Sequence, residues 1–366
     1  MNSFKRTIVI SLWLSLLSLP FSGPLWALLL FLLIIILANL FRISRKVRPE
    51  LKGLKMIKLP SQYPRYMIPS LLLFLFLFPY IMKDYYIDIA ILAGIYIILA
   101  LGLNVVVGFS GLLNLGFAAF YAIGAYTYAL LNVKLGLGFW QSLPVCLIVS
   151  TVAGFVLAIP ALRLRGDYLA IVTLGFGEIT RLILNNWDTL TGGPNGITGI
   201  APPVIYGFSL GTLNRYYYVV ILMVIICYVV IKRVRESRIG RAWIAIREDE
   251  ISAAAMGVNV TLYKLYAFSF GAFWAGLGGI LFAAKMQFVS PESFTFLESV
   301  LILCMVILGG LGSIGGVIVG AIILIVLPEM LRGVQTYRML ALGSALILMM
   351  IFKPHGLFSG LKREGT

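Results

Sequence analysis

Apolar segments separated by short polar loops run through the whole chain. Most are close to the roughly 20 residues that a membrane-spanning helix needs. Twelve can be drawn, at residues 7–19, 24–41, 66–82, 86–107, 112–131, 140–160, 167–186, 216–231, 262–284, 297–311, 313–331 and 337–352. Because 7–19 and 297–311 are short and Gly-rich breaks adjoin 112 and 311, some segments are expected to be half-helices or re-entrant pieces. The pattern predicts an all-α, polytopic transmembrane helical bundle of about 10–12 spans.

Composition supports lipid as the solvent for much of this surface. Hydrophobic residues make up 61% of the chain and charged residues only 12%, whereas soluble proteins carry about 25% charged residues. The mean hydropathy is +1.01. Residues 1–19 resemble a signal peptide, but no small-residue cleavage site precedes Pro20 and a second apolar run follows. We therefore expect an uncleaved first helix.

Basic residues mark one side of the predicted bundle. Of 29 Lys and Arg, eight lie between Arg42 and Arg65 and six between Lys232 and Arg247, as in cytoplasmic loops. Even numbers of apolar segments separate these loops from the remaining basic stretches, which contain Arg163, Arg165, Lys353, Lys362 and Arg363. All basic stretches thus fall on the cytoplasmic side, and the turn-rich loop 187–215 faces outward. This placement accounts for the net charge of +15 without a nucleic-acid partner.

Residues for catalysis or cofactor binding are scarce. The dipeptide Gly-Lys does not occur, so the chain has no Walker A motif and is not a P-loop ATPase by itself. The three cysteines stand alone in apolar stretches, and His355 is the sole histidine, which excludes a multi-histidine metal site. No paired carboxylates have catalytic spacing. We expect a non-enzymatic protein with no cofactor and no metal.

Segment 167–186 carries ionisable residues inside an apolar run. At about 100° per residue, Asp167, Glu178, Arg181 and Asn185 fall within about 60° of one another on a helix. Ionisable residues in membrane helices usually face a bundle interior or a watery path. Two interpretations stay open: Glu178 and Arg181 line or gate a translocation path, or they form a structural i,i+3 ion pair.

Two stretches are rich in glycine. Gly312, Gly316 and Gly320 repeat every four residues, which allows close helix approach, while Gly309, Gly310 and Gly315 beside them are candidates to break a helix. The stretch 104–116 has the same character and adds the polar residues Asn104, Ser110 and Asn114. Irregular backbone at membrane depth must be buried or line a cavity. We expect Asn104 and Asn114 to belong to a translocation path, with plain helix packing as the alternative.

The cytoplasmic segment 237–257 predicts one helix of about 15 residues that ends at Gly257 as a left-handed cap. It is too polar to span a membrane. Trp243, Ile246, Ala253 and Ala254 form a modest apolar stripe, and Glu248, Asp249 and Glu250 form an acidic patch. A contact with a cytoplasmic partner and a helix lying on lipid headgroups are the two interpretations. The acidic patch favours the partner.

Several of these segments together resemble one family. The stretches are Ala100–Gly108, Gly166–Gly175, Thr191–Gly196, Gly240–Trp243, Pro291–Phe294 and Leu308–Ser313. In this order they look like the permease subunits of high-affinity branched-chain amino acid ABC importers, and the match looks closest to the M-type permease. It covers about residues 90–330, whereas residues 1–85 resemble nothing we can name.

The resemblance implies an ABC importer permease fold in a prokaryotic inner membrane. It implies a second unlike permease subunit, two cytoplasmic ATP-binding subunits, an extracytoplasmic solute-binding protein and an amino acid substrate. From the apolar segments and basic loops, we expect residues 1–65 to be N-terminal membrane helices with a basic cytoplasmic loop and residues 354–366 to be a cytoplasmic tail. Residues 66–353 would be the permease core.

The helix near 240–257 would be the coupling helix seated in an ATP-binding subunit, with Gly240, Arg241, Trp243, Glu248, Glu250 and Gly257 as its functional residues. Glu250 and Gly257 are seven apart, so the strict Glu-Ala-Ala…Gly spacing of many importer permeases is missing. Related permeases import urea or short amides, and a stand-alone secondary transporter that uses Glu178 and Arg181 is the other alternative.

Overall fold

The computed structural model describes residues 75, 77–80, 82–162, 164, 166–205, 208–330 and 343. All lie in one of two compact units, Leu73–Thr366. The predicted segments 7–19 and 24–41, the region 1–65 and the tail 354–366 lie outside the described residues. So do most of the predicted segments 66–82 and 337–352.

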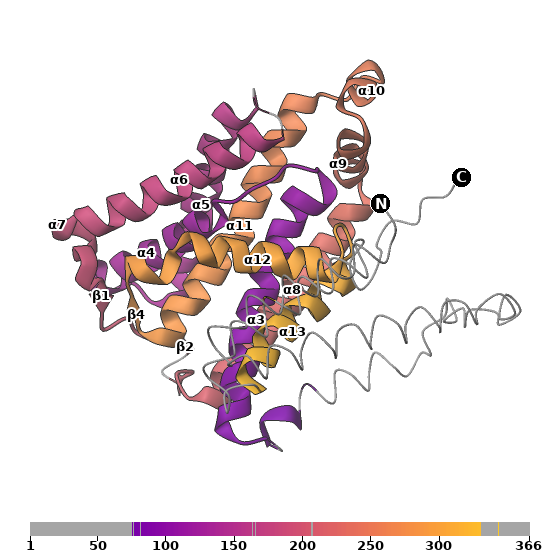
Figure 1. Ribbon diagram of the computed structural model, residues 1–366. Helices are drawn as coiled ribbons and strands as arrows, with labels where there is room; N and C mark the ends of the chain where they lie inside the picture. Colours follow the sequence, from indigo (N-terminus) through magenta and orange to yellow (C-terminus); the bar gives the residue numbers. More distant parts are fainter. Residues whose placement is uncertain are drawn as a thin grey trace, which may run out of the picture. The chain divides into compact units, whose positions relative to one another are not determined.

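Long helices dominate the described part of the chain (Figure 1). They are α3 (Asp84–Leu103), α4 (Phe117–Leu135), α5 (Phe139–Ala161), α6 (Asp167–Asn186), α8 (Leu213–Glu236), α11 (Val260–Met286), α12 (Phe296–Gly309) and α13 (Ile314–Met330). Five helical stretches of the described residues are long and apolar enough to cross a membrane, and Ile314–Glu329 is a shorter apolar helix. The predicted all-α membrane bundle is confirmed.

Short elements connect the long helices. The helical ones are the π-helix η2 (Asn104–Phe109), α7 (Asp188–Thr191), the 3-10 turns η3 (Gly193–Asn195) and η4 (Pro291–Phe294), α9 (Arg238–Glu248) and α10 (Glu250–Ala255). The strands are β1 (Ile197–Thr198), β2 (Val204–Ile205), β3 (Phe208–Ser209) and β4 (Phe288–Val289). β1 pairs antiparallel with β4, with Ile197 opposite Val289, and β2 pairs antiparallel with β3.

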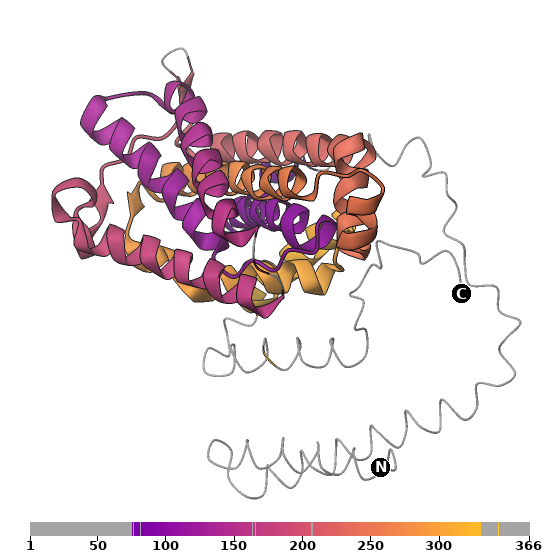
Figure 2. The same ribbon diagram turned by 90° about the horizontal axis from the view of Figure 1, so that it is seen from above.

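The connections gather at two ends of the bundle. Both views place α9 and α10 at one end, and the strands β1 and β4 at the other (Figures 1 and 2). We call the end with α9 and α10 the inner end, because the basic residues 232–247 lie there. At the outer end, Lys134 Nζ donates to the Thr189 carbonyl at 3.1 Å and Asn132 Oδ1 accepts from Ala201 N at 2.7 Å. The outward position predicted for the loop 187–215 agrees with these contacts.

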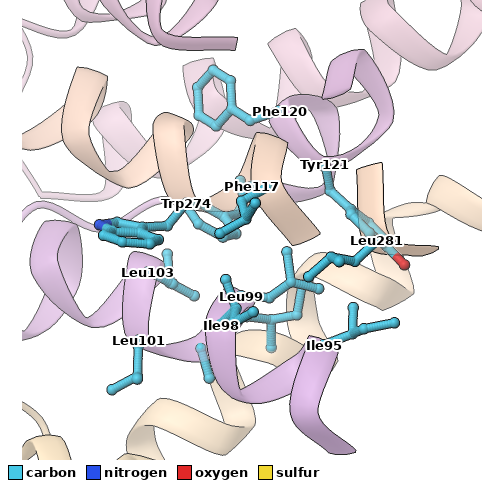
Figure 3. Packing of buried hydrophobic residues seen from close by; sticks show 14 of the residues in the cluster. Ile95, Ile98, Leu99, Leu101, Leu103, Phe117, Phe120, Tyr121, Trp274 and Leu281 are labelled. Atoms are coloured by element: carbon cyan, nitrogen blue, oxygen red, sulfur yellow. The ribbon is translucent and has the colours of Figure 1, made fainter. Parts of the chain in front are cut away.

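Helix α11 packs against α3, α4 and α5 through small residues. A Cβ on Gly124 of α4 would lie 2.4 Å from the Gly276 carbonyl oxygen in α11. One on Gly154 of α5 would lie 2.5 Å from Ala272 Cβ. Such residues let membrane helices approach closely. Figure 3 shows buried apolar side chains between α3, α4 and α11, namely Ile95, Leu99, Leu103, Phe117, Tyr121, Trp274 and Leu281.

Both predicted glycine-rich breaks are present. After α3 the chain continues as η2 and then as an irregular loop to Gly116. Between α12 and α13 it turns at Gly310 (φ 106°) and Gly312 (φ 82°), a backbone region that suits glycine. Gly316 and Gly320 do provide close helix approach, since Cβ atoms there would lie 2.1 and 2.4 Å from the Gly309 and Met305 carbonyl oxygens.

Two glycine predictions of this region need correction. Gly312 belongs to the α12–α13 turn and not to the helix–helix contact, because its positive φ does not continue a helix. Gly315 breaks nothing and lies within α13, where an added Cβ would meet no atom within 4 Å.

Helix α5 turns an apolar face outward. Ile148, Val152, Phe155 and Ile159 are all exposed in the isolated chain. An uncharged apolar surface of this kind does not stay uncovered in water, so lipid or another membrane subunit covers it. The described helices therefore form a multi-pass membrane protein.

Candidate functional site

The inner end carries the predicted coupling segment, and its first turn is fixed to α8. Ser237 caps α9, since its Oγ accepts from Ile239 N at 3.2 Å. Gly240 lies so close to α8 that a Cβ there would be 2.3 Å from the Arg235 carbonyl oxygen. Arg241 is exposed and donates to the Glu236 carbonyl at 2.9 Å. Gly240 and Arg241 thus hold the α8–α9 corner.

Trp243 anchors α9 to the bundle. Its side chain is buried, and Nε1 donates to the Tyr263 carbonyl in α11 at 2.8 Å. Ile246 of α9 and Ala253 of α10 are also buried. Most of the predicted apolar stripe therefore faces the protein's own core, and only Ala254 is exposed.

The prediction of one continuous helix over this segment is wrong. Asp249 adopts an extended conformation (φ −155°, ψ 110°) that ends α9. Its Oδ1 then caps α10 by accepting from Ile251 N at 2.8 Å and Ser252 N at 2.9 Å. These backbone hydrogen bonds lower the pKa of the Asp249 carboxyl. The predicted left-handed cap at Gly257 is confirmed, with φ 83°.

Glu250 is partly buried and bound to a buried lysine. Its Oε1 lies 2.8 Å from Lys264 Nζ, which ties α10 to the first turns of α11. The side chains are 26% and 3% exposed, for Glu250 and Lys264 respectively. A buried ammonium needs such a partner. Glu248, by contrast, is exposed beside the α9–α10 break.

An exposed apolar surface on α10 was not found from the sequence. Ile251 is 71% and Met256 85% exposed, with the exposed Ala254 and Ala255 between them. We call these four residues the α10 surface. Asp249 was an available signal, because aspartate is a preferred N-cap residue. A break there changes which of the following side chains face outward.

Arg247 is a further functional candidate that the sequence did not indicate. From the last turn of α9 its guanidinium donates to the Gly108 carbonyl in η2. Burial lowers the pKa of Arg247, while neighbouring Glu248 acts in the opposite direction. The two residues are 139 positions apart in the chain, so no local pattern indicates the contact.

The predicted polar pair of the 104–116 stretch is fully buried within the chain. Asn104 Oδ1 accepts from Gly312 N at 2.9 Å, which joins η2 to the α12–α13 turn. Asn114 Oδ1 accepts from Gly116 N at 2.9 Å and shapes the loop before α4. A role of Asn104 and Asn114 in translocation stays a prediction.

Glu178 and Arg181 form the ion pair that their spacing predicts. Arg181 Nη2 lies 2.8 Å from Glu178 Oε2, and the side chains are 32% and 33% exposed. They lie on α6 among the exposed apolar residues Ile179, Leu182 and Ile183. A charged pair on such a face is costly in lipid, so protein or water must cover it.

The described residues contain no group of three or more His, Cys, Asp or Glu that could hold a metal ion. Their polar groups at the inner end instead fix helix positions and present the α10 surface.

Comparison with known proteins identifies a family of permeases. The family described as branched-chain amino acid transport system / permease component matches residues 85–353. The high-affinity branched-chain amino acid transport system permease protein LivM of Salmonella typhimurium is 48% identical over 311 residues, or 79% of this chain and 73% of that protein. LivM of Escherichia coli gives the same identity and coverage. The permease LivH of Salmonella typhimurium is 23% identical over 285 residues, or 73% of this chain and 92% of LivH. No solved structure matches.

Proposed function

This chain belongs to the family of permease components of branched-chain amino acid transport systems, and on that premise we propose how it works. It is one transmembrane subunit of an ATP-driven ABC importer that brings leucine, isoleucine and valine into the cytoplasm. It pairs with a second, unlike permease in the inner membrane of a prokaryote. Two cytoplasmic ATP-binding subunits hydrolyse ATP, and an extracytoplasmic solute-binding protein delivers the substrate.

The α10 surface is the observation that carries the proposal. Two large apolar side chains, Ile251 and Met256, stand at the inner end beside the exposed Glu248. Exposed apolar groups with a polar rim are typical of protein contacts. The exposed acidic residues Glu248 and Asp249 disfavour contact with an anionic lipid surface. The partner in this proposal is therefore a protein, namely an ATP-binding subunit.

The support beneath the α10 surface suits a mechanical contact. Trp243 fixes α9 to α11, and the Glu250–Lys264 ion pair fixes α10 to the same helix. Force applied at Ile251 and Met256 is therefore passed to α11, which packs against α3, α4 and α5. In this proposal Glu250 positions the contact, whereas Glu248 lies at its edge.

The face of α6 with Glu178 and Arg181 is proposed to line the substrate path between the two permeases. A neutralised ion pair on a partly exposed membrane helix fits a surface covered by protein and water. A substrate with one ammonium and one carboxylate group suits either charge of the pair.

The test of the proposed contact replaces both large side chains of the α10 surface. The chain carrying Ile251→Lys and Met256→Lys is purified with its second permease and mixed with the ATP-binding subunits. We expect loss of the stable complex and of uptake. Leu135→Lys is the control, because Leu135 is exposed at the outer end. Normal complex formation by the double variant would overturn the proposed contact.

A further inference from the structure

The π-helix η2 lies where α3 reaches the inner end, beside α9 (Figures 1 and 2). Short π segments next to α-helices are frequent at functional sites. The last carbonyls of a helix have no partner within it, and here Arg247 of α9 donates to the Gly108 carbonyl. Gly111 leaves room for this side chain, because a Cβ there would lie 2.9 Å from Arg247 Cγ. The arginine thus has a site shaped for it.

The same turn of η2 contacts the α12–α13 turn. Asn104 Oδ1 accepts from Gly312 N at 2.9 Å. Position 108 has no room for a side chain, since a Cβ there would lie 1.9 Å from Asn104 Oδ1 and 2.7 Å from Gly312 N. A displacement of Gly108 therefore displaces the α12–α13 turn, because no gap separates the two.

This junction contains a polar group without a partner. Asn104 Nδ2 is buried and has no hydrogen bond among the described residues. Burying an amide N–H without a bond is unfavourable. Another arrangement of η2 that gives Nδ2 a partner would compete with this one, as expected of an element with two states.

We propose that Arg247, Gly108, Asn104 and Gly312 form one linkage that passes movement of α9 to the α12–α13 turn during transport. Arg247 and Asn104 are positioning residues in this linkage, and neither needs to contact substrate. The inference rests on the proposed function, because an ATP-binding subunit must move α9. It adds a specific route from α9 into the membrane, separate from the contact at the α10 surface.

The test uses the complete importer in proteoliposomes, with Arg247→Ala, Asn104→Leu and the double variant. Three quantities are measured: binding of the ATP-binding subunits, ATP hydrolysis, and leucine uptake per ATP hydrolysed. We expect binding and hydrolysis to stay within about twofold of wild type, and uptake per ATP to fall about tenfold. The double variant should be no worse than either single one, because both break the same linkage. Lys134→Ala is the matched control, since exposed Lys134 also donates to a backbone carbonyl, that of Thr189, but lies at the outer end.

A second readout does not depend on transport rates. A fluorescent label on Gly315→Cys reports on the α12–α13 turn, because an added Cβ at Gly315 meets no atom within 4 Å. The three native cysteines are first replaced by serine or alanine. ATP should change the fluorescence in the otherwise wild-type importer and not with Arg247→Ala. If Arg247→Ala disrupts assembly, Arg247→Lys is used, which keeps the charge and loses the forked geometry.

The outcomes separate the linkage from the proposed function. If the wild-type chain binds no ATP-binding subunit, the proposed function fails. If the wild-type chain binds it and Arg247→Ala keeps full uptake per ATP, the linkage is refuted. Equal loss of binding, hydrolysis and uptake, with additive effects in the double variant, would show a purely structural role and also refute it.

Discussion

Replacing Glu250 by Gln tests whether this carboxylate positions α10 or contacts a partner. The change leaves the Lys264 ammonium, which is 3% exposed, without its counter-charge. At the observed 2.8 Å separation the attraction is about 6 kcal/mol for an effective dielectric constant of about 20. Most of it offsets desolvation, and removing one partner of a buried pair costs about 3–5 kcal/mol. Since Glu250 is 26% exposed, we expect about 2–3 kcal/mol.

The assay is a double-mutant cycle with Lys264→Met, which removes the buried charge and keeps an unbranched side chain. Unfolding of the purified chain in mixed micelles gives the free energy of each variant. We expect the double variant Glu250→Gln, Lys264→Met to recover most of the loss. Binding of the ATP-binding subunits should recover in parallel, because α10 regains its position.

One result would refute this reasoning. If Glu250 contacts the ATP-binding subunit directly, the double variant regains stability and yet stays defective in binding. Glu248→Gln is the comparison, because exposed Glu248 makes no buried pair in the described structure. It should leave the free energy of unfolding unchanged.

Three further predictions concern the inner end and the α12–α13 hairpin. Trp243→Phe removes the hydrogen bond to the Tyr263 carbonyl and should lower the free energy of unfolding by about 1–3 kcal/mol, measured in micelles. Because the pKa of Asp249 is lowered in the folded protein, its capping of α10 is complete above the ordinary aspartate pKa and is lost as pH falls through the lower folded value. In a pull-down at neutral pH, Asp249→Ala should weaken binding of the ATP-binding subunit and Asp249→Asn should not. Gly316→Val should destabilise the protein and Gly315→Val should not, by thermal melting, because only Gly316 faces backbone within 2.1 Å.

Hydrophobic patterning predicted the helices well because lipid imposes a simple rule on length and composition. The even intervals between basic loops predicted which connections share an end. The bonds from Lys134 to Thr189 and from Arg247 to Gly108 each join two connections that this prediction places on one side, while every basic stretch except 232–247 lies outside the described residues. The i,i+3 pair of Glu178 and Arg181 also follows from local spacing alone. These features depend on residues that are close in the chain.

What the sequence could not predict depends on distant contacts. Glu250 looks like a surface acid until Lys264 is placed beside it, 14 residues further along the chain. The bond from Arg247 to Gly108 and that from Asn104 to Gly312 join segments more than a hundred residues apart. The break at Asp249 was accessible in principle, but its helix-forming neighbours favour one continuous helix. In the three long-range contacts, position in the fold and not residue type decided the outcome.

The most direct test of the central claim is uptake of radiolabelled leucine by proteoliposomes that contain the purified chain and its second permease. We predict uptake when the two ATP-binding subunits, the solute-binding protein and ATP are all present, and none when the ATP-binding subunits are left out. Leucine uptake by the permeases alone, driven by a proton gradient and independent of ATP, would contradict the account.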